Sequence, residues 1–315
     1  MNIVFLDKKT FSNSIDLNAL ETEHSLTSYE TTTPEQVVSR CIHADVVITN
    51  KVVIDSDTLS LLPDLKLICI AATGTNNVDL EAAKALNVRV CNVSGYSTPS
   101  VAQYVFSQLL AHFQQIVDHN ANTQAGNWSK SETFCILGQP IDELKDKTIA
   151  IVGYGTLGRK VADIATAFDM QVIIAERPGE TPREGRVVFE EAMSQADIVT
   201  LHCPLTPQTQ DLINQDTLAL MKPNAILVNT ARGAVVNSQA LYTALKQKQI
   251  ALAIVDVLEQ EPPPHDHILL QGDLTNLVVT AHIAWASQQA QQRLINLIAR
   301  NISAFQQGQP TNVVA

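Results

Sequence analysis

The chain has 315 residues, 45% of them hydrophobic, and a formal net charge of −11. This length suits two domains, because single hydrophobic cores rarely grow beyond about 250 residues. The acidic balance, without any run of Lys and Arg, argues against nucleic-acid binding, which needs a basic face to neutralise phosphates. No apolar run reaches the ~18 residues of a membrane-spanning helix, and the short apolar start resembles a strand more than a leader peptide. We therefore expect a cytoplasmic protein that binds neither membranes nor nucleic acid.

The five cysteines are spread widely along the chain, at Cys41, Cys69, Cys91, Cys135 and Cys203. None lies within four residues of another, so the spacing typical of zinc sites is absent. Their odd number also argues against a disulfide framework. We expect no metal site, and we interpret the cysteines as small apolar residues in a reducing compartment.

Short apolar runs alternate with helix-like stretches along most of the chain. The expected strands are Ile3–Leu6, Val46–Ile48, Leu67–Ile70, Val88–Val90, Thr148–Val152, Gln171–Ala175, Ile198–Leu201, Ala225–Val228, Leu252–Val255 and Leu277–Thr280. Helical candidates between them include Pro34–Arg40 and Asp79–Leu86, and a last helix is expected over Ser287–Gln306. This βαβ rhythm predicts parallel sheets and an α/β fold.

A long helix is expected to begin at Thr98, because Pro99 suits a first turn and apolar residues then recur every three or four positions. The segment Gly126–Asp146 that follows has no clear periodicity, although it contains Trp128 and Phe134. It is either an arm that packs on another subunit or a surface loop of its own domain.

The segment Gly153–Gly158 has the pattern GxGxxG, which is a weak signal when it stands alone. Here it follows an apolar strand, begins a helical stretch and precedes a second strand that ends at Glu176. This is the order of a dinucleotide-binding βαβ unit, in which helix amides hold the pyrophosphate. Glu176 is placed to accept ribose hydroxyls, which favours NAD, whereas Arg177 could meet a 2′-phosphate. A tight turn without a ligand is the alternative.

Several polar residues fall directly after predicted strands. They are Gly153, Glu176, His202, Arg232, Asp256 and His282. The carboxyl ends of parallel strands share one edge of a sheet, where α/β proteins bind ligands. We therefore expect these residues to gather at a single site.

Three of the polar residues suit the reduction of a 2-keto acid. Arg232 can hold a carboxylate or polarise a keto oxygen, and His282 can deliver a proton near neutral pH. Glu261 can orient the histidine and raise its pKa. The alternatives are a solvated loop acid for Glu261 and a buried cap to a neighbouring loop for Asp256.

With these motifs the chain resembles the D-isomer-specific 2-hydroxyacid dehydrogenase family over nearly its whole length. The motifs that carry the resemblance are Val152–Gly158, His202–Thr206, Asn229–Gly233, Asp256–Leu258 with Glu261-Pro262, and His282–Trp285. The resemblance implies an NAD-binding Rossmann domain inserted in a flavodoxin-like substrate domain, both doubly wound. Residues 1–98 and 285–315 would form the substrate domain and residues 99–284 the NAD domain, with hinges near Thr98 and Ala284. Domain closure would bring Ala72–Thr75 onto the substrate.

The resemblance also assigns roles to individual residues. The catalytic set would be Arg232, Glu261 and His282. The cofactor would meet Thr73, Gly153, Gly155, Thr156, Leu157, Gly158, Glu176, Arg177, His202, Cys203, Pro204, Thr209, Thr230, Ala231, Asp256 and Ala284, with Asp256 at the nicotinamide carboxamide. The substrate would meet Lys51, Thr73, Gly74, Thr75 and Trp285. Lys51 could equally be a surface lysine, and Trp285 a packing aromatic.

Within the family, segments such as Thr49–Lys51 and Thr73–Asp79 resemble the bacterial glycerate dehydrogenase, or hydroxypyruvate reductase, branch. The family is usually dimeric, which favours a homodimer and an arm at Gly126–Asp146. Two departures are Glu176 in place of a more usual aspartate, which leaves NADP use open, and Ala281 before the histidine in place of proline.

Other functions within the same fold stay open at this stage. A formate dehydrogenase would pair the histidine with a glutamine. Glu261 stands at that position here and argues against this function. Phosphite dehydrogenases, D-lactate dehydrogenases and broad 2-keto acid reductases differ only in pocket residues outside the motifs. An NAD-responsive corepressor or binding module is the non-enzyme alternative, although the chain has no evident tail or basic face for a partner.

Overall fold

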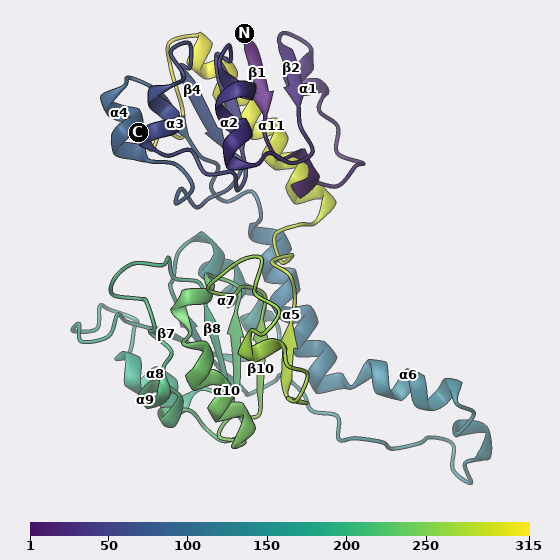
Figure 1. Ribbon diagram of the computed structural model, residues 1–315. Helices are drawn as coiled ribbons and strands as arrows, with labels where there is room; N and C mark the ends of the chain where they lie inside the picture. Colours follow the sequence, from purple (N-terminus) through teal and green to yellow (C-terminus); the bar gives the residue numbers. More distant parts are fainter. The chain divides into compact units, whose positions relative to one another are not determined.

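The computed structural model describes all residues from Met1 to Ala315. The chain forms two compact units, of which unit 1 comprises Met1–Ser97 and Trp285–Ala315, and unit 2 comprises Thr98–Ala284 (Figure 1). Each unit contains one sheet in which every pair of neighbouring strands is parallel. The predicted α/β class with two doubly wound parallel sheets is therefore confirmed.

Unit 1 is built on a five-stranded sheet in the order β2-β1-β3-β4-β5. Its strands are β1 (Asn2–Phe5), β2 (Ser25–Ser28), β3 (Val46–Thr49), β4 (Leu67–Ile70) and β5 (Arg89–Cys91). Its α-helices are α1 (Asn18–Glu21), α2 (Pro34–Cys41), α3 (Ser56–Ser60), α4 (Leu80–Ala85) and α11 (Gln288–Gln306), with a 3-10 turn η1 at Lys8–Thr10. The strand order reverses between β1 and β3, and ligands of open α/β sheets bind at such a switch point.

Helices cover both faces of the unit 1 sheet. On one face Ile3 and Ile48 pack with Ile298 of α11, and on the other Val4 and Val47 pack with the helices α2, α3 and α4. All four positions of β3 and of β4 are consequently buried. Such strands are continuous apolar runs rather than alternating ones.

Unit 2 is built on a six-stranded sheet in the order β11-β10-β9-β8-β6-β7. Its strands are β6 (Thr148–Val152), β7 (Gln171–Ala175), β8 (Ile198–Leu201), β9 (Ile226–Asn229), β10 (Leu252–Val255) and β11 (Leu277–Val279). Its α-helices are α5 (Thr98–Gln114), α6 (Ile116–Gln124), α7 (Thr156–Ala167), α8 (Phe189–Gln195), α9 (Gln215–Leu220) and α10 (Ser238–Lys246), and its 3-10 turns are η2 (Trp128–Lys130), η3 (Gly233–Val235) and η4 (Ile268–Leu270). The helices α5 and α7 cover one face, and α8, α9 and α10 cover the other. The switch point lies between β6 and β8.

Five of the predicted strands coincide with observed ones at both ends, namely β4, β6, β7, β8 and β10. Several elements were not predicted, among them the edge strand β2 and the helix α6. The edge strand β2 is mostly exposed and has no apolar alternation, and α6 buries none of its residues. Both therefore lack the hydrophobic pattern from which sequence reasoning starts.

The helix α6 and the chain that follows it project from the side of unit 2 (Figure 1). Large apolar side chains on this segment are exposed to solvent, among them Val117, Trp128, Phe134 and Leu137. Phe134 is 90% exposed and Leu137 is 87% exposed. We call residues 116–141 the arm. Exposed apolar patches of this kind mark contact surfaces.

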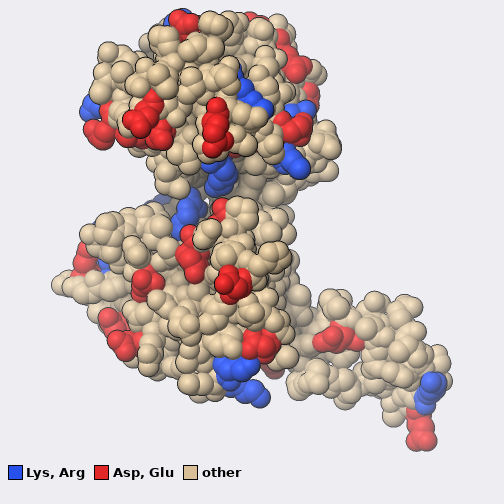
Figure 2. Space-filling view, in the orientation of Figure 1, with Lys and Arg blue, Asp and Glu red and all other residues tan.

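The face of the molecule shown in Figure 2 carries scattered charges. On the face shown in Figure 2, Lys and Arg lie singly or in small groups among Asp and Glu and do not merge into one continuous patch. None of the helices combines the length and the apolar character that crossing a bilayer requires.

Candidate active site

The glycine-rich loop joins β6 to α7 at the switch point of unit 2. Gly153 has a φ of +98°, and a Cβ there would lie 2.5 Å from the backbone nitrogen of Cys203. A Cβ on Gly158 would lie 2.2 Å from the carbonyl oxygen of Gly153. Two of the three glycines are thus required by the close approach of backbone to backbone.

Gly155 differs from the other two glycines of the loop. A Cβ built there would meet nothing within 4 Å, so the protein itself does not require a glycine at this position. Gly155 is the N-cap of α7. No side chain caps this end of the helix, and the first turn contains no acidic residue. The first turn of α7, with the amides of Thr156 and Leu157, is therefore left without a capping side chain, as a pyrophosphate site requires.

Two buried polar atoms beside this loop have no hydrogen-bond partner in the protein. They are Nδ1 of His202, after β8, and Oγ1 of Thr230, after β9. Nε2 of His202 lies 3.0 Å from Oγ1 of Thr200, and burial lowers the pKa of the imidazole to about 4. Orphaned buried polar atoms are uncommon and call for a partner. Together with the glycine cradle, they fit the expected dinucleotide.

Three other residues expected to meet the cofactor, Cys203, Pro204 and Thr209, lie in the loop after β8. Cys203 is buried and Pro204 is exposed. Oγ1 of Thr209 donates to the carbonyl of Pro204 at 2.7 Å and accepts the amide of Thr206 at 2.8 Å. Thr209 therefore shapes this loop through its own hydrogen bonds, while Ala231, after β9, is buried beside Asn229.

Glu176 follows β7 directly, as expected, but its carboxylate is not open to a ribose. Its side chain is fully buried, and it accepts hydrogen bonds from Nε and Nη2 of Arg183. Arg177 instead turns to Glu180, with 3.6 Å between its Nη1 and the Oε1 of that acid. The hydrogen bonds from Arg183 hold the pKa of the Glu176 carboxyl well below its usual range, although burial opposes them.

Asp256 directly follows β10 and accepts hydrogen bonds from the loop after β11. Its Oδ1 accepts the amide of Ile283 at 2.9 Å, its Oδ2 accepts the amide of Ala284 at 2.8 Å, and Thr280 donates its hydroxyl at 2.5 Å. Asp256 is 1% exposed. The cap to a neighbouring loop, which the sequence left as the alternative, is thus its observed contact, and a contact with a carboxamide stays a prediction.

The loop that Asp256 holds presents His282 in an uncommon backbone conformation. His282 has a φ of +53°, in the left-handed region, and its amide donates to the carbonyl of Asp256 at 2.7 Å. Non-glycine residues adopt this region only where the surroundings fix it, and such residues concentrate at functional sites. The two amides bound by Asp256 follow His282 directly and provide that support.

His282 and Glu261 form a hydrogen-bonded pair. Nδ1 of His282 lies 2.6 Å from Oε2 of Glu261, and Oε1 of the same acid accepts the amide of Leu258 at 3.0 Å. An ionised carboxylate only accepts, so Nδ1 carries the hydrogen and Nε2 is the ring atom that faces away from the pair. The histidine side chain is 25% exposed, so this second nitrogen can exchange a proton with a ligand.

Arg232 follows β9, two strands from β11 in the same sheet. Its Nη1 donates to the carbonyl of Ala231 at 2.7 Å, and the residue is half-buried. The next residue, Gly233, abuts the backbone of Leu258 so closely that a Cβ would lie 1.8 Å from its carbonyl carbon. The loop of Arg232 is therefore packed on the loop that carries Glu261, at one edge of unit 2.

In unit 1 the candidate Lys51 lies at the switch point between β1 and β3. The buried carboxylate of Asp7, at the end of β1, accepts the amides of Asn50, Lys51 and Val52. The shortest of these contacts, to the amide of Lys51, is 2.7 Å. Burial raises the pKa of Asp7 despite the amide hydrogen bonds. Lys51 itself is exposed, on a turn that Asp7 fixes.

The other unit 1 candidates divide into a loop and a packed aromatic. Thr73 to Thr75 follow β4, and Thr73 donates its hydroxyl to the carbonyl of Val93 at 3.0 Å. Trp285 packs edge-on against Phe11 and Tyr96, with ring centroids 5.8 and 6.1 Å away. The observed role of Trp285 is packing, and its contact with a substrate stays a prediction.

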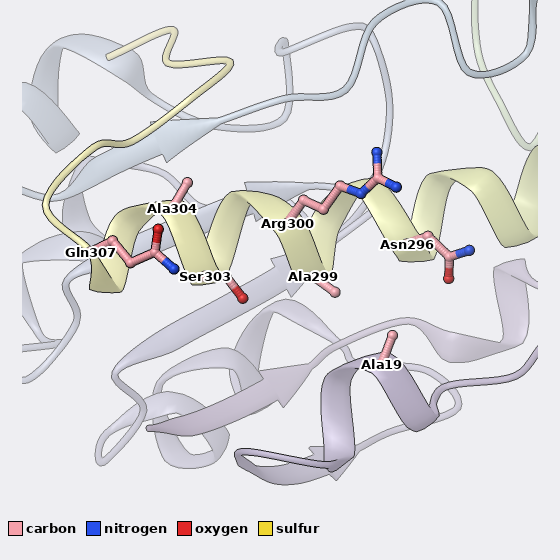
Figure 3. A pocket seen from close by; sticks show the side chains of 7 residues that line it. All are labelled: Ala19, Asn296, Ala299, Arg300, Ser303, Ala304 and Gln307. Carbon is pink, nitrogen blue, oxygen red and sulfur yellow. The ribbon is translucent and has the colours of Figure 1, made fainter.

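Two surface hollows are lined by residues other than these candidates. One, of about 430 Å³, runs between α1 and α11 and is lined by small and polar side chains such as Ala19, Arg300 and Ser303 (Figure 3). The other, of about 450 Å³, lies in unit 2 by Gln210, Ser238 and Glu259. Neither contains a residue that the sequence assigned to the site.

Sequence reasoning missed two residues that contact candidate residues, one within each unit. Asp7 is a single acid after a short strand, and Arg183 lies seven residues beyond Glu176 in an irregular loop. The position of Asp7 after a strand was the one available signal, because the same rule singled out Asp256. Nothing in the sequence distinguishes Arg183 from the neighbouring Arg177 and Arg186.

Comparison with known proteins adds an independent line of evidence. Residues 106–284 match the model of the D-isomer specific 2-hydroxyacid dehydrogenase NAD binding domain. The chain is 42% identical to a glycerate dehydrogenase of Methylorubrum extorquens, over 99% of this chain and 98% of that protein. It is 33% identical to a hydroxypyruvate reductase of Blautia hydrogenotrophica, over 100% and 99% of the two chains. A solved acyclic imino acid reductase, Bsp5, in complex with NADPH and D-Arg superposes with a TM-score of 0.86 at 29% identity, covering 100% of both chains.

Proposed function

Because the chain belongs to the D-isomer-specific 2-hydroxyacid dehydrogenase family, we propose that it interconverts D-glycerate and hydroxypyruvate with NAD(H), and also reduces glyoxylate. The observation that carries this proposal is the pair formed by His282 and Glu261 at 2.6 Å. The pair supplies a proton donor oriented by a carboxylate, which the reduction of a keto group requires.

In the proposed reaction His282 is the catalytic acid and base. Its Nε2 donates a proton to the oxygen that becomes the hydroxyl group and takes the proton back in the reverse direction. Glu261 keeps Nδ1 protonated and offsets the charge of the imidazolium form. The nicotinamide ring, when bound, supplies or accepts the hydride.

Arg232 has the second catalytic role in this proposal. Its guanidinium presents several N–H donors in one plane, which suits the carboxylate and keto oxygen of a 2-keto acid. We propose that Lys51 and the amides of Thr73–Thr75 also bind the substrate, and that Asp7 is a positioning residue for Lys51. The contact of Asp7 with the amide of Lys51 supports this assignment.

The cofactor is bound by unit 2 in this proposal. Thr156 and Leu157 would donate amides to the pyrophosphate, and His202 and Thr230 would find in the dinucleotide the partners that they lack in the protein. The position of Asp256 and Ala284 after β10 and β11 of the same sheet supports this assignment, and we propose that Thr73 of unit 1 also meets the cofactor. NADP is a second candidate cofactor, since a similar solved structure holds NADPH.

The choice of substrate rests on the named relatives rather than on the pocket. Glycerate dehydrogenase and hydroxypyruvate reductase are the names of proteins similar over the full chain. Hydroxypyruvate differs from pyruvate by one hydroxyl group, and a site that hydrogen-bonds this group discriminates strongly against its absence.

The decisive experiment follows absorbance at 340 nm with NADH and hydroxypyruvate, glyoxylate or pyruvate supplied singly. We expect kcat/KM for hydroxypyruvate to exceed that for pyruvate by at least about tenfold. Equal values for the two acids would indicate a broad 2-keto acid reductase. Binding of NADH without turnover of any of these acids would overturn the proposed reaction in favour of a binding module.

We further propose that the protein is a cytoplasmic homodimer that uses its arm as the contact. The arm exposes apolar side chains, including Phe134 and Leu137, that its own unit does not cover. Light scattering after size-exclusion chromatography should give twice the chain mass, and Phe134→Asp with Leu137→Asp should give the single chain mass. A monomeric wild type would refute the dimer.

A further inference from the structure

The adenosine end of the cofactor site in unit 2 ends in an arginine-rich loop. The loop runs from Glu176, after β7, to Val187, whose amide donates to the carbonyl of Ile174 at 3.0 Å. It contains Arg177, Arg183 and Arg186 within twelve residues. Glu176 is the position from which a carboxylate normally accepts the ribose hydroxyls of NAD.

The acceptor capacity of Glu176 is already used within the protein. Its Oε2 accepts Nε of Arg183 at 2.6 Å and the amide of Arg183 at 3.2 Å. Its Oε1 accepts Nη2 of Arg183 and the amide of Arg177, the latter at 3.0 Å, and Nη1 of Arg186 lies 3.5 Å away. A carboxylate offers about four lone-pair sites. The carboxylate is fully buried, so a ribose diol meets no open acceptor there.

Two of the three arginines of the loop, by contrast, are largely exposed to solvent. The side chain of Arg183 is 55% exposed and that of Arg177 is 73% exposed. Arg183 has five N–H donors, and only those on Nε and one on Nη2 face Glu176. The pair therefore holds a guanidinium fork in place, with donors left for a second anion.

We propose that Glu176 and Arg183 form a preorganised site for the 2′-phosphate of NADPH, in which Glu176 positions Arg183 and Arg183 binds the phosphate. Arg177 adds a second, weaker contact, because Glu180 lies 3.6 Å from its guanidinium. The inference rests on the proposed function, since it assigns the loop to the cofactor of that reaction. Its consequence is that NADPH binds at least as tightly as NADH.

Binding of NADH at the same place carries a cost that binding of NADPH does not. To accept the 2′- and 3′-hydroxyls, Glu176 must release the bidentate Arg183, which is the stronger kind of ion pair. With NADPH the pair stays intact and the phosphate meets the exposed side of the fork. Arg183, rather than Arg177, is therefore the residue that sets cofactor preference.

The test measures binding, so that it does not depend on turnover. Titration calorimetry with NADPH and NADH should give a dissociation constant for NADPH no larger than that for NADH. Arg183→Gln should raise the dissociation constant for NADPH by at least about tenfold, the usual effect of losing a charge-assisted contact. The same variant should leave the dissociation constant for NADH unchanged or lower it, because Glu176 no longer pairs with Arg183 and can accept the ribose hydroxyls. Arg89→Gln, which removes an exposed charge from unit 1, is the matched control and should alter neither constant.

A second measurement avoids variants altogether. Adenosine 2′,5′-bisphosphate should displace a bound nucleotide from the wild type at a lower concentration than AMP. Stronger binding of NADH than of NADPH, or equal effects of Arg183→Gln on both nucleotides, would overturn the assignment while leaving the dehydrogenase reaction intact. If the predicted selectivity holds but no 2-keto acid is reduced, the proposed function fails and the phosphate site stands.

Discussion

Two buried aspartates, one in each unit, have the same structural role. Each follows a strand of a parallel sheet and accepts backbone amides of the loop after the neighbouring strand. Asp7 follows β1 and holds the turn after the neighbouring strand β3, and Asp256 follows β10 and holds the loop after the neighbouring strand β11. Each carboxylate accepts successive backbone amides. In both sheets a buried acid at the carboxyl edge therefore fixes a loop that carries a candidate functional residue.

The two loops differ in what the acid has to hold. Asp256 supports His282 at a φ of +53°, and it also accepts the hydroxyl of Thr280. Asp7 accepts three consecutive amides, and neither Asn50 nor Lys51 is among the residues with positive φ. The loop in unit 2 is thus held in an uncommon conformation and carries the proposed proton donor, whereas the turn in unit 1 is held in an ordinary conformation.

We call each of these buried carboxylates, together with the backbone amides that it accepts, a clamp. The difference indicates that the two clamps serve different tasks. A group that transfers a proton must be placed within hydrogen-bond reach of one atom, so its backbone is over-determined. A group that attracts a carboxylate by charge tolerates more freedom. We therefore expect changes around His282 to lower kcat and changes around Lys51 to raise KM.

The largest effect should come from His282→Gln. Without the proton donor, kcat should fall by about 10²- to 10⁴-fold, the usual contribution of general acid catalysis. The dissociation constant for NADH should stay close to the wild-type value. His265→Gln, which replaces an exposed histidine of the preceding loop, is the control and should keep full turnover. Equal loss of turnover and NADH binding would instead identify His282 as a structural residue.

The next effect should come from Asp256→Asn, which weakens the clamp but keeps its shape. The amides of Ile283 and Ala284 lose a charged acceptor, so His282 is no longer held in its left-handed conformation. We expect kcat to fall by about 10²-fold, as a displacement of about 1 Å of a catalytic group does. Asp197→Asn is the control, because Asp197 accepts the amide of Thr148 at the opposite edge of the same sheet. Similar kcat values for the two variants would contradict the role of the clamp.

In unit 1, Asp7→Asn should raise KM for hydroxypyruvate by about tenfold, equivalent to about 1.4 kcal/mol. The turn that carries Lys51 becomes looser, while the cofactor site in unit 2 is untouched. Steady-state kinetics should therefore show little change in kcat, and calorimetry should show none in NADH binding. Asp55→Asn, which removes a carboxylate that accepts the amide of Thr58 at the start of α3, should leave KM unchanged. A lower kcat with an unchanged KM would contradict the proposed role of Asp7 as a positioning residue for Lys51.

The contrast also explains what could be predicted from the sequence. Strands buried on both faces are continuous apolar runs, so β4, β6 and β10 could be located to the residue. The glycine loop and Asp256 follow such strands, and His282 follows the partly buried edge strand β11. Parallel topology alone gathers the three on one edge of the sheet. The edge strand β2 and the helix α6 bury little, and hydrophobic pattern cannot reveal them.

The contacts of single acids were harder to predict. Whether a carboxylate caps a loop, faces solvent or pairs with an arginine depends on backbone positions many residues away. Asp7 meets amides more than forty residues later in the chain, and Glu176 meets Arg183 across an irregular loop. Sequence spacing gives no measure of either distance, whereas the order of elements does give the edge on which they lie.

The smallest effect should be the pH dependence of the Asp7 clamp. Burial raises the pKa of Asp7 above its ordinary value of 3.8, so the folded protein binds this proton more tightly than the unfolded chain. The stability that Asp7 contributes is then full below pH 3.8 and declines as pH rises through the folded pKa. Asp197 has the opposite sign, because hydrogen bonds from Lys222 and the amide of Thr148 lower its pKa although burial opposes them.

Urea unfolding at about pH 3 and at pH 7 should separate the two acids. Relative to the wild type, Asp7→Asn should cost more free energy of unfolding at the lower pH, because the stability contributed by Asp7 is full below its unfolded pKa of 3.8 and has declined at pH 7. Asp197→Asn should cost more at pH 7, because the stability contributed by Asp197 is complete above pH 3.8 and is lost as pH falls through its lowered folded pKa. The same sign for both variants would mean that the amide hydrogen bonds of Asp7 outweigh its burial, and the clamp would then be strongest in its charged form.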